Sequence, residues 1–118
     1  LLELGDWLFP NVHPYWHGLT DPKPAVEWTV SQFEQLKARS NKPIVFKEVG
    51  LPSAGDARVD EAKQAEYYRL LLETEVYFVA FEAFDGPWKD WAPVEPYWGL
   101  FRADRTPKSA AKVFSQVR

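Results

Sequence analysis

The sequence contains no cysteine and no methionine. Without cysteine, the chain has no means of forming disulfide bonds or thiolate metal sites. No apolar run approaches the ~20 residues that a membrane-spanning helix needs, and no signal peptide is recognisable. Because the chain begins at Leu1 and lacks methionine, we expect a native start upstream, in a parent protein that is secreted, periplasmic or membrane-tethered.

Basic residues are neither numerous nor clustered. Fourteen Lys and Arg stand against 17 Asp and Glu, which gives a net charge of −3. Nucleic-acid binding depends on clustered positive charge, so we expect no nucleic-acid partner. Aromatic residues are abundant instead, with six Trp, five Tyr and eight Phe. They could fill a core, or some Trp beside Pro and Gly could line a cleft in which a sugar ring stacks on an indole.

Three apolar segments are each followed by a helical pattern. The chain of 118 residues has the length of one domain. A strand-helix unit of about 30 to 35 residues is typical of βα pairs, and continuous apolar strands indicate a parallel sheet covered by helices. The predicted fold class is therefore α/β, and three strands are too few to close an eight-stranded barrel. The expected strands lie within residues 7–14, 44–46 and 76–81, and the expected helices cover 24–39, 60–73 and a last segment that opens at Thr106-Pro107 and includes Val117.

Polar side chains follow each expected strand, and Glu48 is the most distinctive of them. It ends the apolar run Ile44–Phe46, beside Gly50, which we expect to leave room above the sheet edge. Ligands bind at the carboxyl ends of parallel strands, so Glu48 is a candidate catalytic carboxylate. The alternative is a surface strand end whose carboxylate pairs with Lys42 or Lys47.

A second group of candidates follows the first strand. Alternation along an extended strand would send Asn11, His13 and Tyr15 to one side, where they could hydrogen-bond sugar hydroxyls. His13 could instead orient a carboxylate. His13 and His17 have a metal-ligand spacing, but Pro14 breaks the helix that would bring them together. We therefore expect no metal site.

A third group follows the last strand. Glu82 and Asp85 are acidic, Trp88 could stack on a sugar, and Lys89 could pair with an active-site carboxylate and hold it ionised. Simple alternation does not allow Glu82 and Asp85 to face the same side.

With these residues in view, the chain resembles glycoside hydrolase family 17, the β-1,3-glucanase family, over nearly its whole length. Three segments carry the resemblance: residues 11–15 as the strand-six motif, 42–53 as the strand-seven nucleophile motif, and 81–89 as the strand-eight motif.

The resemblance implies that residues 1–118 are the C-terminal portion of a (β/α)8 TIM barrel, strands six to eight. It implies a retaining β-1,3-glucan hydrolase or transglycosylase with Glu48 as nucleophile and no metal or organic cofactor. Asn11, Tyr15, Trp88 and Lys89 would serve the donor-sugar subsite. The family's acid/base Glu follows an Asn at strand four, and no Asn-Glu pair occurs here. The acid/base is therefore expected upstream, in a missing N-terminal part of the barrel, and this fragment alone is expected to be inactive.

Two alternatives stay open. One is a non-catalytic carbohydrate-binding remnant that keeps the aromatics and has lost the acid/base. The other is a Trp-rich protein-interaction domain, since Trp is enriched at interface hot spots.

Overall fold

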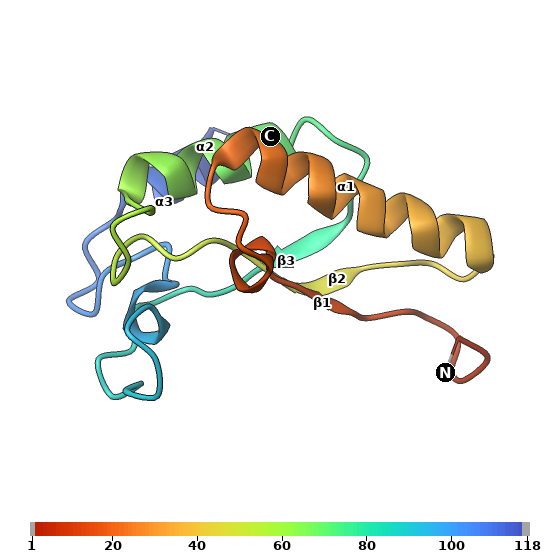
Figure 1. The fold of residues 1–118 in the computed structure, drawn as a ribbon, viewed down its shortest axis with the longest axis horizontal. Helices are drawn as coiled ribbons and strands as arrows, with labels where there is room; N and C mark the ends of the chain where they lie inside the picture. The colour runs from red at the N-terminus through yellow and green to blue at the C-terminus, as the bar shows by residue number, and fades with distance from the viewer. Residues whose placement is uncertain (1, 117–118) are drawn as a thin grey trace.

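The computed structural model describes residues 2–116, and a three-stranded parallel sheet lies at its centre (Figure 1). The strands are β1 (Asn11–Val12), β2 (Phe46–Val49) and β3 (Phe78–Ala80), in the order β1-β2-β3. Both strand pairs are parallel. The predicted parallel sheet is confirmed; its place as the last three units of a (β/α)8 barrel stays a prediction.

Helices connect the strands and cover one face of the sheet, the upper face in Figure 1. They are α1 (Pro22–Arg39), α2 (Glu61–Leu71) and α3 (Ser109–Ser115). Two short 3-10 helices, η1 (Pro14–His17) and η2 (Glu95–Tyr97), lie in the connections beyond the strands. The strand-helix alternation is the one that parallel strands require, because each must be reached by a crossover. Within residues 2–116, no helix is both long and apolar enough to span a membrane.

The strands are shorter than the apolar segments, and the last helix begins later than predicted. Pro10 accepts a hydrogen bond from the Lys47 N–H at 3.0 Å but has no N–H to give back, which interrupts the first ladder. The last helix begins at Ser109 because Phe101 pairs in antiparallel fashion with Pro107, which keeps that segment extended. Val117, expected in this helix, lies outside the described residues.

The two Asp residues that precede α1 and α2 behave differently. Asp60 caps α2 as its sequence position suggests, accepting a hydrogen bond from the Lys63 N–H at 2.7 Å. Asp21 precedes α1, but its carboxylate pairs with the Lys63 side chain at 3.1 Å and caps no backbone N–H. The start of α1 therefore rests on Pro22, whose fixed φ angle suits the first helical turn.

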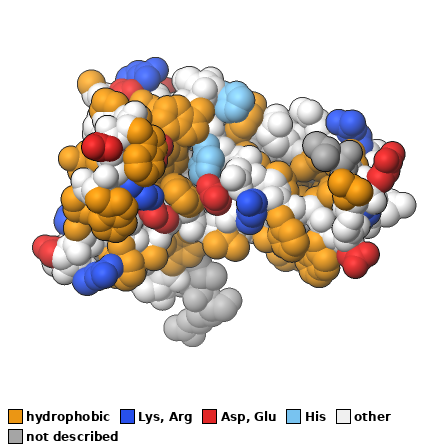
Figure 2. All heavy atoms as spheres, turned by 90° about the horizontal axis from the view of Figure 1, so that it is seen from below, with side chains coloured by type: hydrophobic (Ala, Val, Ile, Leu, Met, Phe, Trp, Pro, Cys, Tyr) orange, Lys and Arg blue, Asp and Glu red, His pale blue; other side chains and the backbone are white. Residues whose placement is uncertain are grey.

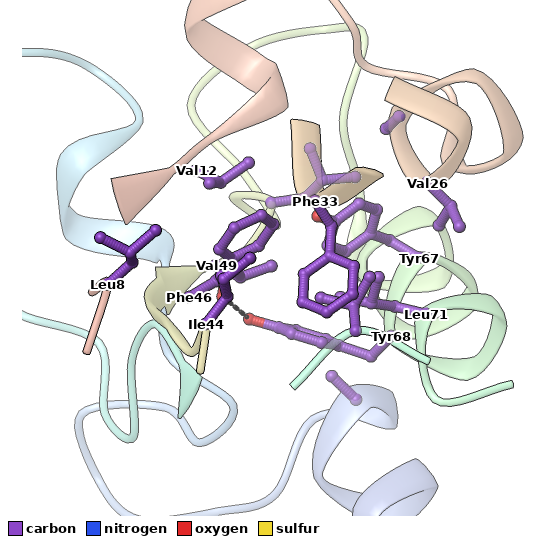
Figure 3. Packing of buried hydrophobic residues seen from close by; sticks show 14 residues of the cluster. Leu8, Val12, Val26, Phe33, Ile44, Phe46, Val49, Tyr67, Tyr68 and Leu71 are labelled. Atoms are coloured by element: carbon purple, nitrogen blue, oxygen red, sulfur yellow. Dashed lines mark hydrogen bonds between the residues drawn. The ribbon is translucent and has the colours of Figure 1, made fainter. Parts of the chain in front are cut away.

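The core lies between the sheet and the helices and contains much of the aromatic content (Figure 3). Phe46 on β2 meets Phe33 on α1 edge to face, with ring centroids 5.7 Å apart. Tyr67 and Tyr68 on α2 are fully buried, and the Tyr67 hydroxyl bonds to Thr29 at 2.8 Å. Burial of each such side chain stabilises the fold by about 1.5–3 kcal/mol.

The ends of β2 and β3 meet at Gly50. The Phe81 N–H donates to the Val49 carbonyl at 2.7 Å. The Tyr68 hydroxyl lies 3.1 Å from the same carbonyl and 3.2 Å from that of Phe81 (Figure 3 draws the first of these bonds). A Cβ on Gly50 would lie 2.4 Å from the Phe81 oxygen and 2.7 Å from the Tyr68 hydroxyl. The space that this glycine leaves is therefore filled by backbone and by Tyr68, and is not open above the sheet edge.

Gly50→Ala should destabilise the protein because backbone cannot retreat from the new Cβ as a flexible side chain can. We expect a loss of about 1–3 kcal/mol in the free energy of unfolding, measured by urea denaturation. Gly86→Ala is the control, since its Cβ would meet only the side chains of Trp88 and Lys89, at 3.1 Å or more. Equal losses in the two variants would contradict this account.

Candidate active site

The carboxyl ends of the three strands meet at one edge of the sheet, at the left of Figure 1, where η1 and the long connections gather. The β1-β2 register places Asn11 opposite Glu48. Two polar groups predicted from separate segments are thus neighbours, because parallel pairing aligns the strand ends. Asn11 is exposed at this edge.

Glu48 and His13 are in direct contact. The His13 Nε2 lies 3.2 Å from the Glu48 Oε1, and the two side chains are 16% and 34% exposed. The His13 ring is held edge-on between Phe81 and Trp98, with centroid distances of 5.3 and 5.2 Å. The structure shows the contact that the prediction requires, between His13 and a carboxylate. The orienting role of His13 stays a prediction.

The contact uses one of the two imidazole nitrogens. The other, the His13 Nδ1, is buried and has no partner among the described residues. The alternative pairing of Glu48 with Lys42 is absent from the described residues, because Lys42 donates to the Leu2 carbonyl at 2.6 Å.

Tyr15 does not continue the strand, which corrects the expectation from alternation. At Pro14 the chain turns into η1, so Tyr15 is presented from a 3-10 turn. Its hydroxyl donates to the Asp56 Oδ2 at 2.7 Å. Its ring lies between Trp16 and Trp98, with centroids 4.9 and 6.2 Å away. Tyr15 therefore belongs to the rim of the site. It is linked to Glu48 through Trp98 and His13.

Glu82 and Lys89 form an ion pair in the loop after β3. The Lys89 Nζ also lies 5.1 Å from the centroid of Phe81, whose ring packs on His13. The predicted pairing of Lys89 with a carboxylate is observed, with Glu82 as the partner. Trp88, next in the chain, is 73% exposed and leaves its indole free for a ligand.

Asp85 has a more buried setting, and its predicted contact with substrate stays a prediction. Its Oδ1 accepts hydrogen bonds from the Lys108 Nζ at 2.6 Å and from the Gly99 N–H at 2.9 Å. Lys108 is only 2% exposed and also donates to the Ser53 Oγ at 2.8 Å. These groups form a buried brace that ties the loops after β2 and β3 to the start of α3. Sequence reasoning missed Lys108 because an isolated Lys before a helix reads as a surface residue.

No group of three or more metal-ligating side chains occurs within residues 2–116. His13 and His17 do not converge: His13 faces Glu48, and the His17 ring lies against Trp28 with centroids 4.5 Å apart. The chemistry at this edge is therefore that of carboxylates, one imidazole and indole faces.

A family model matches most of the chain. The family described as the BtgE/BtgC glycoside hydrolase domain matches residues 1–99. The chain belongs to this family. The resemblance to β-1,3-glucan-active glycoside hydrolases of family 17 is thereby confirmed.

Curated relatives carry related names. The chain is 32% identical over 144 residues to a probable glucan endo-1,3-beta-glucosidase, btgC, of Aspergillus flavus, covering 96% of this chain and 20% of that protein. It is 30% identical over 131 residues to a glucan 1,3-beta-glucosidase of Schizosaccharomyces pombe, covering 92% of this chain and 38% of the relative. The chain thus spans about a fifth to two fifths of the length of these relatives.

Solved structures give the same result. A family 17 β-1,3-glucanosyltransferase of Rhizomucor miehei superposes with a TM-score of 0.75 at 28% identity, over 87% of this chain and 41% of that chain. An active-site mutant of the Rhizomucor miehei transferase, in complex with laminaritriose, gives 0.77. A β-glucuronidase of Bifidobacterium dentium, at 19% identity and a TM-score of 0.73, shares the fold alone.

Lys108→Met should be strongly destabilising because it leaves the Asp85 carboxylate buried without its cation. The expected loss is about 3–5 kcal/mol in urea unfolding. Adding Asp85→Asn should recover part of this loss, since the remaining group is neutral. Lys37→Met, which breaks only exposed pairs with Glu34 and Glu75, should change stability by less than about 1 kcal/mol. If Lys108→Met lowers the free energy of unfolding no more than Lys37→Met does, the buried contacts of Lys108 do not stabilise the fold as described.

Proposed function

We propose that this chain forms strands six to eight of a retaining β-1,3-glucan hydrolase or transglycosylase in which Glu48 is the nucleophile. The observation that carries the proposal is the contact between Glu48 and His13 at the carboxyl edge of the sheet. It occurs in a chain whose family is one of glycoside hydrolases, and similar proteins are named for action on β-1,3-glucan.

In this proposal, the hydrogen bond from the His13 Nε2 to the Glu48 Oε1 leaves Oε2 free to attack the anomeric carbon. The glycosidic oxygen departs with a proton from the acid/base Glu and a glycosyl-enzyme forms on Glu48. Water or a sugar hydroxyl then gives its proton to the acid/base and displaces Glu48, so the β configuration is retained. Two carboxyl groups about 5–5.5 Å apart perform both steps. We place the second one upstream of Leu1.

The sugar subsite next to Glu48 would use Asn11, Trp88 and the Glu82–Lys89 pair. Asn11 lies opposite Glu48 in the register and is exposed, so its amide is free to bond a sugar hydroxyl. Trp88 offers an exposed indole face for stacking. Lys89 forms an ion pair with Glu82, and the Glu82 carboxylate would accept hydrogen bonds from sugar hydroxyls. Tyr15 contributes its ring at the rim.

The rest of the barrel would cover the face of the sheet that has no helices among the described residues. Figure 2 views the molecule from that side and shows hydrophobic side chains in several groups across it. Several large apolar residues are more than half exposed, among them Trp7, Phe9, Tyr77 and Val79, which lie in or near the strand segments. Exposed apolar side chains along a sheet call for a partner. The solved structures that match the chain are more than twice as long, TIM-barrel glycosidases, so we infer that preceding strands of the same polypeptide fill this face.

Val79→Lys in the whole protein should therefore cost stability, although Val79 is exposed in this chain. A lysine buried inside a barrel loses hydration, and we expect a loss of at least about 2 kcal/mol in urea unfolding. Ala38→Lys, on the exposed surface of α1, should change stability by no more than about 0.5 kcal/mol. If both variants are equally stable, the sheet face is free and the barrel assignment fails.

Glu48→Gln should reduce hydrolysis of soluble β-1,3-glucan by the whole protein by on the order of 10³-fold or more, because the amide cannot form the glycosyl-enzyme. Glu27→Gln, a matched change at an exposed position of α1, should leave the rate unchanged. Glu48→Ala should regain turnover with azide, which attacks the anomeric carbon directly and yields an α-glycosyl azide.

Two outcomes would overturn the assignment. Hydrolysis that survives in Glu48→Gln would remove Glu48 from the reaction. A native protein that binds glucan without any turnover would favour the non-catalytic carbohydrate-binding alternative.

A further inference from the structure

A second group of exposed aromatic and polar side chains lies beside the candidate active site. It comprises Tyr15 and Trp16 from η1 and Asp56 and Arg58 from the loop after β2, and we call it the rim cluster. It reaches Glu48 through two packed rings: Trp16 lies on Trp98, with centroids 6.2 Å apart, and Trp98 packs on His13.

Trp16 is 52% exposed although its surroundings are built to hold it in place. The Tyr15 ring contacts the Trp16 ring nearly at right angles, with an interplanar angle of 82°. The fully buried Trp98 ring makes a second contact with the Trp16 ring. An aromatic ring that is fixed by packing and still half exposed loses little entropy when a ligand stacks on it.

Arg58 is held beside Tyr15, with its guanidinium carbon 6.0 Å from the centroid of the Tyr15 ring. Its Nε donates to the Asp56 Oδ1 at 3.1 Å and its Nη2 to Oδ2 at 2.7 Å. The Tyr15 hydroxyl donates to the same Oδ2, so Asp56 is saturated with donors. The Arg58 guanidinium beside it, and then the Tyr15 hydroxyl, hold the pKa of the Asp56 carboxyl well below its ordinary value. Arg58 stays 58% exposed, and its Nη1 has no partner among the described residues.

We propose that the rim cluster is an additional subsite that binds a neutral pyranose unit of the glucan, with the Trp16 indole against the sugar face and the Arg58 Nη1 donating to a hydroxyl. This inference rests on the proposed function and extends it by naming where the chain of sugars runs beyond Glu48. Within this additional subsite, Asp56 and Tyr15 are positioning residues, because Asp56 fixes Arg58 and Tyr15 fixes Trp16.

The charge of the cluster selects the class of ligand. Asp56 compensates Arg58, so the rim offers fixed donors without net positive charge. Binding of an anionic saccharide would need an unpaired cation, whereas hydroxyl groups need only a directed N–H and an apolar face. A neutral glucan fits this chemistry.

The test uses the whole protein with two substrates, laminaritriose and a long soluble β-1,3-glucan. Trp16→Ala and Arg58→Ala should each lower kcat/KM on the long glucan by about tenfold, equivalent to one good stacking or hydrogen-bond contact. Both should change kcat/KM on laminaritriose much less, because a short substrate can occupy the catalytic subsites without reaching the rim. Trp16→Phe should restore most of the loss.

Arg69→Ala is the matched control, since Arg69 on α2 forms a similar two-bond pair with a nearby carboxylate, that of Glu66. It should leave both substrates unaffected. Losses in the rim variants should persist at high salt, because the ligand is uncharged.

Equal losses on both substrates, or no loss on either, would overturn the rim subsite while leaving Glu48 as nucleophile. Loss of the effect at high salt would show that the variants act through charge rather than through stacking and a directed hydrogen bond, and would also overturn the rim subsite. Failure of the proposed function would be distinct: Glu48→Gln would then remain active on both substrates.

Discussion

The close approach of β2 and β3 at Gly50 is the constraint on which the candidate site depends. Here the two backbones and the Tyr68 hydroxyl lie so close together that residue 50 has no room for a side chain. The contact fixes Phe81 immediately after β3, and Phe81 is one of the two rings that clamp His13. The orientation of the His13 imidazole toward Glu48 therefore follows from packing several residues away, on helix α2. A preorganised carboxylate needs this kind of support, since small errors in its position are costly for reaction rates.

Two ion pairs in the loop after β3 have opposite surroundings, although their acids are three residues apart. Asp85 pairs with Lys108 in the interior, where the pair joins three segments of the chain. Glu82 pairs with Lys89 at the partly open edge next to Phe81. A buried pair is costly to break and acts as a structural tie. The Glu82–Lys89 pair is less buried than the Asp85–Lys108 pair. The same motif thus contributes one acid to the framework and one to a more accessible ion pair.

The aromatic residues likewise fall into a buried group and an exposed group. Tyr67, Tyr68 and Trp98 are buried and form the support behind the sheet edge, while Trp16 and Trp88 remain exposed on it. Exposed indoles beside a buried aromatic layer are fixed in direction, which is what stacking on a sugar requires. Composition alone left open whether the Trp residues fill a core or line a cleft; in the structure Trp98 is buried, whereas Trp16 and Trp88 are exposed.

Periodicity and turn residues determined the elements and their order, because apolar runs of strand length alternate with helical patterns whatever the tertiary context. They also located Glu48, since a carboxylate that ends a buried strand is visible in the sequence. Tertiary structure alone decided which polar groups meet: Tyr15 left the strand at Pro14, Asp85 turned to the buried Lys108, and Arg58 joined the rim through Asp56. These contacts join residues far apart in the chain or depend on how loops turn, and local sequence carries no signal for either.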